Sequence, residues 1–453
     1  MSRALTLLTA FAFALPGCAG DTTSANGTEA ADALSEDAPS EDTSAAGGGS
    51  KDVPESDASG SGTDSESGDS EGSTDAASDS ESPKDSSSAD PGEEGTTDGT
   101  TPDPDAIEEE DDPPDEAPDF LDLGEPIEAP PLEWTWIPFS EAICGDGSST
   151  GLGINLSPGA TRALIYLEGG GACWDWNTCF GILPTSFHLS GYDENEFNGL
   201  LTSVYLNTLI FNRDEPKNPL RDAHLVFIPY CTGDAHAGDQ VLEIKGLFPW
   251  ENETMHFKGH SNLIQFLNRL VPTFSDVDHL VLAGGSAGGF GAGINWPWVA
   301  AAFGSGKRVD LLDDSGPPLE PAGDLWQTWM QNWGLVLPPG CPECDEGLPT
   351  LLDHLRETVL VNNRMGLASF THDPIISVFF TMLPFQFAEK LKELTAVFNL
   401  EPNAQYFILP GALHTMTIGP GYEFFEAGDG MPLWFWVEQM ISDDPEWGSH
   451  GPW

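Results

Sequence analysis

Positively charged residues are scarce in this sequence. The 453 residues include 16 Lys and Arg against 74 Asp and Glu, which gives a net charge of −58 at pH 7. A nucleic-acid-binding surface needs clustered basic side chains to neutralise phosphates, and so acidic a chain does not supply them. The composition therefore argues against nucleic acid as a partner.

Long apolar runs are also missing. Residues 4–15 form the longest one, which follows a short positive stretch and is too short to cross a bilayer as a mature helix. The run ends in Leu15-Pro-Gly-Cys18, which resembles a bacterial lipoprotein signal in which the cysteine becomes the lipidated first residue. A plain secretory signal with a chance cysteine is the alternative. Both interpretations predict export with residues 1–17 as the signal peptide, and the first adds a lipid anchor at Cys18 that holds the protein on the membrane, in the periplasm or at the cell surface.

Large apolar side chains are nearly absent from residues 18–130, where Asp, Glu, Ser, Gly, Thr, Ala and Pro dominate. Residues 1–130 hold 35 of the 74 acidic residues and 3 of the 16 basic ones. Such a segment cannot bury enough apolar surface to offset its ordering entropy, so we expect residues 18–130 to be a disordered acidic tether. A folded domain is expected over residues 131–453.

Cysteines are few, and six remain besides Cys18. An even number in an exported domain predicts disulfides, for which fifteen pairings are possible. The favoured pairing joins the local pairs Cys173–Cys179 and Cys341–Cys344 and leaves Cys144–Cys231. The single C-x-x-C at Cys341 also has redox or half-zinc spacing, but no second C-x-x-C exists.

Strand-like and helix-like segments alternate in the folded part. A hairpin is expected from residues 133–138 and 151–156. Short apolar runs predict strands buried on both faces; they cover residues 162–167, 223–229, 279–283, 308–312, 405–409 and, more weakly, 365–370. Helical periodicity covers residues 261–270, 289–301, 384–398 and 431–441. The alternation predicts a mainly parallel sheet with helices on both faces and with loop insertions at 181–211 and 316–353 over its C-terminal edge, where ligands bind in such folds.

The chain's strongest motif is Gly284-Gly-Ser286-Ala-Gly288, which lies between a predicted strand and a predicted helix. In that context G-x-S-x-G forms a nucleophile elbow of the α/β-hydrolase type, and Ser286 is the predicted nucleophile. The alternative is a tight glycine turn with a solvent-facing serine.

A serine nucleophile needs a base and an acid from elsewhere in the chain. His414 follows the last predicted strand, where an α/β-hydrolase presents its histidine. Asp373 follows the preceding strand and is the favoured acid, and the pair Asp313 and Asp314 after an earlier strand is the alternative.

Charge that develops on the attacked carbonyl needs fixed donors. Glu168-Gly-Gly-Gly171 follows a strand upstream of the elbow and matches an oxyanion loop in position. Backbone N–H groups of Gly170, Gly171 and Ala287 are therefore the predicted oxyanion hole. His236, His256 and His260 suggest a metal site, but they lack an acidic third ligand in register, so we expect no metal and no cofactor.

Five motifs in order resemble the pectin acetylesterase/Notum family of serine hydrolases: Leu167-Glu-Gly-Gly-Gly-Ala-Cys173, Phe227-Ile-Pro-Tyr-Cys-Thr-Gly-Asp234, Gly284-Gly-Ser-Ala-Gly-Gly289, Asp314-Ser-Gly316 and Leu409-Pro-Gly-Ala-Leu-His414-Thr. The likeness spans residues 132–445. It implies an α/β-hydrolase fold with the triad Ser286, His414 and Asp373. The chain departs from the family's lipid-removing animal deacylases at Gly171, where they carry Trp, which argues against a lipid tunnel.

The sequence thus predicts an exported serine carboxylesterase acting on short acyl esters, most plausibly acetyl groups on a polysaccharide. A depolymerase of hydroxyalkanoate polyesters with the same triad is the first alternative. A non-catalytic surface-binding lipoprotein on a hydrolase scaffold is the second. Trp174, Trp176 and Trp326 suit either a substrate cleft or the core.

Overall fold

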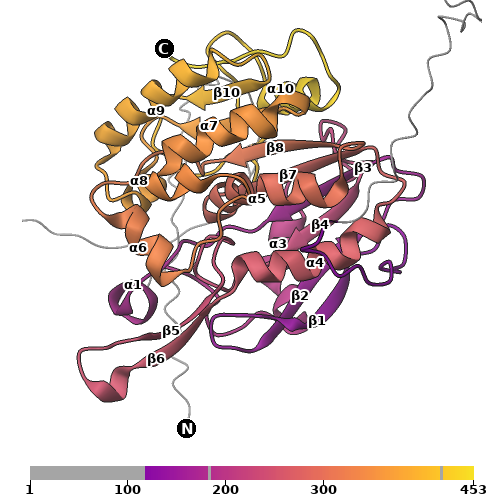
Figure 1. Ribbon diagram of the computed structural model, residues 1–453. Coiled ribbons are helices and arrows are strands. Elements are labelled where there is room, and N and C mark those ends of the chain that lie inside the picture. The colour runs from indigo at the N-terminus through magenta and orange to yellow at the C-terminus, as the bar shows by residue number, and fades with distance from the viewer. Residues whose placement is uncertain (1–117, 182–184, 419–421) are drawn as a thin grey trace, which may run out of the picture. The chain divides into compact units, whose positions relative to one another are not determined.

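The computed structural model describes residues 118–181, 185–418 and 422–453 (Figure 1). The predicted signal peptide, the anchor at Cys18 and the tether up to residue 117 lie outside these residues. The strands are β1 (Thr135–Ile143), β2 (Ser149–Asn155), β3 (Arg162–Leu167), β4 (His224–Ile228), β5 (Gln240–Ile244), β6 (Glu253–Phe257), β7 (His279–Gly285), β8 (Arg308–Asp314), β9 (Met365–Phe370) and β10 (Ala404–Leu409). The helices are α1 (Trp176–Phe180), α2 (Glu194–Phe197), α3 (Leu200–Leu206), α4 (Gly259–Thr273), α5 (Ala287–Phe303), α6 (Leu325–Asn332), α7 (Leu348–Thr358), α8 (Pro374–Phe379), α9 (Pro384–Phe398) and α10 (Leu433–Ile441).

Eight of these strands form one sheet in the order β1-β2-β4-β3-β7-β8-β9-β10. Strand β2 is antiparallel to both of its neighbours, and all pairs from β4 to β10 are parallel. Each of the strands predicted from an apolar run is present in this sheet, including the weak candidate at β9. The α/β-hydrolase-like class predicted from the sequence is confirmed by this mainly parallel sheet.

Helices cover both faces of the sheet, and the strands alternate between two cores. On β3, the side chains of Ala163, Ile165 and Leu167 join a core with α4, α5, α7 and α9. The side chains of Leu164 and Tyr166 join the opposite core, which includes residues of α3 and α10. Figure 1 shows α4 and α5 crossing in front of the sheet. Burial on both faces explains why the strands read as continuous apolar runs.

The folded region begins earlier than the sequence predicted. Residues 118–130 were expected in the tether, yet Ile127 is buried and its N–H donates to Thr273 Oγ1 on α4 at 2.7 Å. The ring of Phe120 packs edge-on against Trp298 at 5.1 Å. The predicted boundary at 131 is therefore wrong, because the few apolar residues of this segment dock on α4 and α5 without forming a strand or helix.

A second, two-stranded sheet was not predicted. Strands β5 and β6 pair as a hairpin that extends from the main sheet (Figure 1). Its tip exposes Leu247 and Trp250, and the ring of Phe248 stacks on Trp250 at 4.7 Å. The tip is held to α1, because Trp176 Nε1 donates to the Glu251 carbonyl at 3.1 Å.

Three disulfides join Cys144 to Cys231, Cys173 to Cys179 and Cys341 to Cys344. This is the pairing favoured from the sequence. It leaves the C-x-x-C cysteines bonded to each other, so they offer no free thiolates for zinc.

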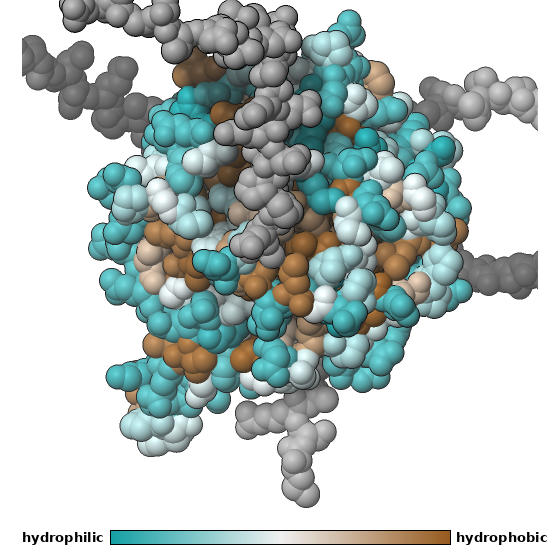
Figure 2. Space-filling model, turned by 45° about the vertical axis from the view of Figure 1, so that its right-hand side comes forward, coloured by the Kyte–Doolittle hydropathy of each residue, from teal (hydrophilic) through white to brown (hydrophobic). Residues whose placement is uncertain are grey.

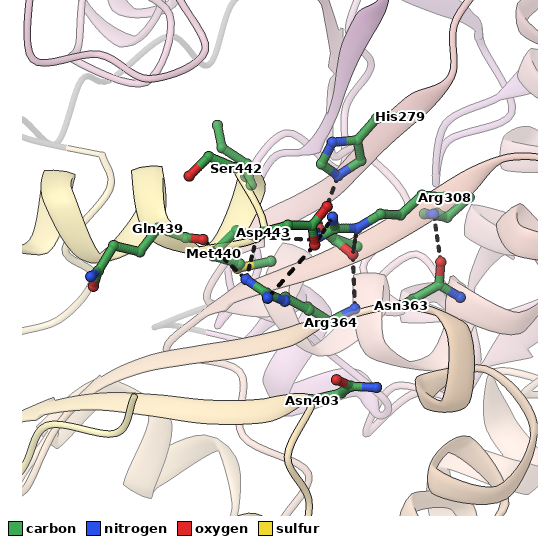
Figure 3. Close-up of polar contacts among 12 residues, drawn as sticks. His279, Arg308, Asn363, Arg364, Asn403, Gln439, Met440, Ser442 and Asp443 are labelled. Atoms are coloured by element: carbon green, nitrogen blue, oxygen red, sulfur yellow. Dashed lines mark hydrogen bonds and ion pairs between the residues drawn. The ribbon is translucent and has the colours of Figure 1, made fainter. Parts of the chain in front are cut away.

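Basic side chains gather at the C-terminal end of α10 (Figure 3). Arg308 on β8 and Arg364 before β9 both donate to the carbonyl of Met440, and both form ion pairs with Asp443. Cations at a helix C-terminus offset its exposed carbonyls and its dipole. Buried Asp310 completes the cluster, because its carboxylate accepts from Arg308, from His279 Nε2 at 2.9 Å and from the Arg364 N–H at 2.8 Å.

Replacing Asp310 with alanine is expected to lower the free energy of unfolding by about 3 kcal/mol, because it leaves partly buried cationic and imidazole donors without their acceptor. Urea denaturation monitored by circular dichroism measures this loss. The matched control is Asp222→Ala, which removes the exposed partner of Arg221 and should cost less than about 0.5 kcal/mol. Equal losses in the two variants would contradict a stabilising role for the cluster.

The surface is predominantly hydrophilic on the face that Figure 2 shows, with apolar areas between the polar side chains. Among the residues that the structure describes, no helix combines the length and apolar character needed to cross a bilayer.

Candidate active site

Ser286 lies between the end of β7 and the start of α5, and it adopts φ 58° and ψ −123°. A positive φ is strained for a residue with a side chain, and such strain persists only where the surrounding structure enforces it. The Ser286 N–H donates to the Asp314 carbonyl at 2.7 Å, which holds the turn. Ser286 is buried, with 8% of the residue exposed. This is the strand–turn–helix geometry expected of a nucleophile elbow.

His414 and Asp373 form a pair. His414 Nδ1 lies 2.7 Å from Asp373 Oδ2, and the Asp373 side chain is fully buried while that of His414 is 20% exposed. The other carboxylate oxygen, Oδ1, accepts from the N–H groups of Ile375 and Ile376 at the start of α8. These bonds fix the carboxylate, which in turn leaves the Nε2 of His414 available to act as the base.

The loop that carries His414 lies beside the elbow. A side-chain carbon built on Gly285 would lie 3.6 Å from Thr415 Cγ2. Within the described residues the Ser286 hydroxyl makes no hydrogen bond, so the Ser–His contact is not closed in this arrangement. Such contacts are commonly long before substrate binds and tighten in the reacting complex.

The alternative acids lie elsewhere. Asp313 Oδ1 accepts from the Gly316 N–H at 2.8 Å. The Asp314 carboxylate accepts from the backbone of Met416 and Thr417 and not from the His414 ring. The structure thus pairs Asp373 with His414 and gives Asp314 a different set of partners, which the sequence did not predict.

The predicted oxyanion loop touches the elbow. A side-chain carbon on Gly169 would lie 2.4 Å from the Gly285 carbonyl and 3.1 Å from Ser286 Cβ, so only glycine allows this approach. Gly171 has φ +77°, which also requires glycine. Ala287 is the first residue of α5, so its N–H has no acceptor within the helix. Gly170, Gly171 and Ala287 are therefore placed on the two segments that border Ser286.

Two buried side chains support this loop and were not predicted to do so. Glu168 Oε2 accepts from the Tyr230 N–H at 3.0 Å, and the Glu168 carbonyl accepts from His236 Nε2 at 2.8 Å. Burial lowers the pKa of His236 to about 4, so the ring is neutral and can hold this contact at ordinary pH. Burial raises the pKa of Glu168 to about 8, although the hydrogen bond from Tyr230 opposes the rise.

The raised pKa of Glu168 has a consequence for stability. The unfolded carboxyl ionises near 4.5 and the folded one near 8, so the folded state holds its proton over this range. The contribution of the Glu168 carboxyl to the free energy of unfolding is therefore complete below pH 4.5 and is lost as the pH rises through 8. We expect the wild-type free energy of unfolding to fall by about 2 kcal/mol between pH 6 and pH 9 relative to Glu168→Gln.

Urea denaturation at the two pH values measures that difference. Glu141→Gln, which replaces an exposed carboxylate of β1, is the control and should follow the wild type at both pH values. Parallel pH dependence of the wild type and Glu168→Gln would contradict a protonated Glu168.

The three histidines considered for metal binding do not converge. His256 lies on β6 and its Nδ1 contacts the Gly145 carbonyl, while His260 lies on α4 and pairs with Asn295 Oδ1 at 2.8 Å. Their four-residue spacing therefore does not lie on one helix. Across residues 118–181, 185–418 and 422–453, no cluster of His, Cys, Asp or Glu could hold a metal ion.

The three tryptophans that were compatible with either a substrate cleft or the core differ in burial. Trp326 is 2% exposed and packs against Trp329, so it belongs to the core. Trp174 and Trp176 are half-buried on and before α1.

Comparison with known proteins identifies the region that carries these features. Residues 134–327 match the family model described as pectinacetylesterase, and this stretch includes Glu168, the glycine loop and Ser286. Over this stretch the chain is therefore similar to the pectinacetylesterase family. The matched stretch ends before Asp373 and His414, which lie in the C-terminal part of the sheet.

Several curated proteins resemble part of the chain at moderate identity. The palmitoleoyl-protein carboxylesterase NOTUM of Mus musculus is 29% identical over 181 residues, which cover 40% of this chain and 32% of the relative. The human NOTUM is 30% identical over 163 residues, covering 36% and 30%. The Schmidtea mediterranea NOTUM is 30% identical over 163 residues, covering 34% and 27%. The chain thus spans about a third of the length of the curated relatives it matches, and these relatives are named as carboxylesterases.

Among solved structures, the Wnt deacylase Notum from Drosophila aligns with a TM-score of 0.49 and 18% identity. The alignment covers 68% of this chain and 95% of the other.

Proposed function

We propose that this protein is an exported serine carboxylesterase that hydrolyses short acyl esters through Ser286, His414 and Asp373. The observation that carries the proposal is the strained Ser286 elbow, which has the glycine loop on one side and the loop of the hydrogen-bonded His414–Asp373 pair on the other. Similarity of residues 134–327 to the pectinacetylesterase family model, and partial similarity to relatives named carboxylesterases, support it. A non-catalytic scaffold would have no need to maintain a positive φ at Ser286.

The proposed reaction follows from the geometry. His414 Nε2 takes the proton of Ser286, whose oxygen attacks the ester carbonyl. Backbone N–H groups of Gly170, Gly171 and Ala287 stabilise the oxyanion, and Asp373 stabilises the imidazolium. The imidazolium then gives its proton to the departing alcohol, and water cleaves the acyl-enzyme by the same steps in reverse order.

We further propose that the acyl group is short, namely acetyl on a polysaccharide. The pectinacetylesterase description of the matched segment supports this substrate class. Gly171 supports it as well, because it offers no side chain to line an acyl tunnel. The proposed location is outside the cytoplasm with a lipid anchor at Cys18, which is supported by the sequence of residues 1–18.

A panel of 4-nitrophenyl esters tests the proposal. The full chain should hydrolyse the acetyl and butyryl esters faster than the octanoyl and palmitoyl esters, and Ser286→Ala serves as the inactive control. A preference for long chains would replace the acetyl-ester proposal with a long-chain deacylase like the curated relatives. Activity on a film of hydroxyalkanoate polyester, without release of acetate from acetylated pectin, would instead favour a polyester depolymerase.

A further inference from the structure

Asp314, the last residue of β8, contacts both the nucleophile segment and the base segment. Its carbonyl accepts the Ser286 N–H at 2.7 Å. Its carboxylate accepts from the N–H of Met416 at 2.8 Å, from the N–H of Thr417 at 2.6 Å and from the Thr417 hydroxyl at 2.7 Å. One residue thus connects the turn that carries Ser286 with the loop that carries His414.

The connection is buried. Asp314 is fully inaccessible to solvent, and burial raises the pKa of its carboxyl while the donors of Thr417 and Met416 oppose the rise. A buried carboxylate is tolerated only where donors replace its lost water, and this loop supplies three donor groups. Asp314 is therefore a buried hydrogen-bond acceptor for the backbone and Thr417 side chain of the His414 loop.

Ser315, which follows Asp314, makes a second contact with the His414 loop through residues in strained backbone conformations. Ser315 has φ +65° and Thr415 has φ +62°, and the Thr415 N–H donates to Ser315 Oγ at 3.3 Å. Two residues with side chains in left-handed backbone face each other here. Such conformations cost about 1–3 kcal/mol each and cluster at sites where geometry matters.

We propose that Asp314, with Ser315, is a latch that positions His414 relative to Ser286. The inference rests on the proposed esterase function, for which it assigns an additional positioning residue. Asp373 fixes the orientation of the imidazole through Nδ1, but a bond at Nδ1 does not set the distance from Nε2 to the Ser286 hydroxyl.

That distance depends on how the loop sits against the elbow. Residues 410–418 are held at one end by Gly411, whose N–H donates to Thr371 Oγ1 at 3.1 Å, and at the other end by the latch. Releasing the latch leaves the His414 backbone fixed on one side only. A displacement of 1 Å in a catalytic group costs about 10²-fold in rate.

The test compares three variants of the full chain with 4-nitrophenyl acetate. In Asp314→Asn one acceptor oxygen becomes an NH₂ group that faces N–H and O–H donors, while the backbone bond to Ser286 remains. We expect kcat to fall about 10²-fold with KM changed less than twofold. Thr417→Val removes one donor to Asp314 and should lower kcat by less than Asp314→Asn does. Thr417→Ser keeps the hydroxyl donor and should have the wild-type kcat.

Each rate is normalised to the folded fraction, and amide hydrogen exchange at Met416 and Thr417 follows the loop directly. The latch predicts faster exchange at these two amides in Asp314→Asn. An unchanged kcat in folded Asp314→Asn would overturn the proposal. If Asp314→Asn does not fold, the Thr417 pair decides, and equal kcat values for Val and Ser would overturn the latch. If the wild type shows no Ser286-dependent turnover, both the proposed function and the latch are overturned. If the wild type turns over normally and Asp314→Asn and Thr417→Val do so too, only the latch is overturned.

Discussion

Ser286→Ala is expected to reduce kcat for 4-nitrophenyl acetate by about 10⁶-fold, which corresponds to about 8 kcal/mol of transition-state stabilisation. The loss is large because the serine oxygen forms the covalent bond to the acyl group. KM should change little, since the substitution removes a single oxygen. Steady-state kinetics over a wide range of enzyme concentrations measures the ratio.

Covalent labelling gives a second readout for the same variant. A fluorophosphonate should label the wild-type chain at Ser286 and leave Ser286→Ala unlabelled. Ser203→Ala, which alters an exposed serine of α3, should retain both labelling and turnover. Labelling of Ser286→Ala at the wild-type rate would show that another residue is the nucleophile.

Asp373→Asn is expected to lower kcat by about 10⁴-fold with little change in KM. The amide can still accept from the N–H groups at the start of α8, so the local fold should survive. With its oxygen on that side, the amide turns its NH₂ group toward His414 Nδ1 and cannot accept a hydrogen bond from a protonated Nδ1. His414 therefore loses both the tautomer that it needs as a base and the negative charge that stabilises its imidazolium. Kinetics between pH 6 and pH 9 and thermal unfolding of the same preparation separate catalysis from stability.

Asp314→Asn is the matched comparison for the acid. The predicted order is a loss of about 10⁴-fold for Asp373→Asn and about 10²-fold for Asp314→Asn. Asp373 is hydrogen-bonded to the imidazole, whereas the Asp314 carboxylate is hydrogen-bonded to the loop and not to the imidazole. The reverse order would identify Asp314 as the acid and would contradict the pairing of Asp373 with His414 seen at 2.7 Å.

The sequence was most informative where the pattern is local. Strand β7, the G-x-S-x-G turn and helix α5 are contiguous, so apolar periodicity and glycine spacing sufficed to predict the elbow. The parallel strands were predictable because burial on both faces leaves short continuous apolar runs such as β3 and β10. The assignment of His414 used chain order, which the sheet preserves.

Features that depend on contacts between distant segments were not predicted. The β5–β6 hairpin was missed because Gln240–Ile244 and Glu253–Phe257 mix exposed charged and apolar residues. The docking of residues 118–130 was missed because those residues pack through isolated side chains and not through a periodic face. Asp314 was considered only as an alternative acid. Nothing in the Asp-Asp-Ser-Gly sequence shows that its carboxylate accepts from the N–H groups of Met416 and Thr417, about a hundred residues later. For Glu168, the sequence showed only an acidic residue at the head of the glycine loop, and its role became clear only from the Tyr230 contact.

Two of the three disulfides crosslink segments next to the proposed oxyanion loop. Cys173 follows Gly171 by two residues and closes a bond with Cys179. Cys231 follows Tyr230, the residue that binds the Glu168 carboxyl, and is tied to Cys144. The loop that is to stabilise the reaction's negative charge is thus assembled in part by oxidation. A chain kept in a reducing cytosol would lack these two crosslinks. If the chain is exported as proposed, oxidation of these cysteines outside the cytosol would complete the proposed site.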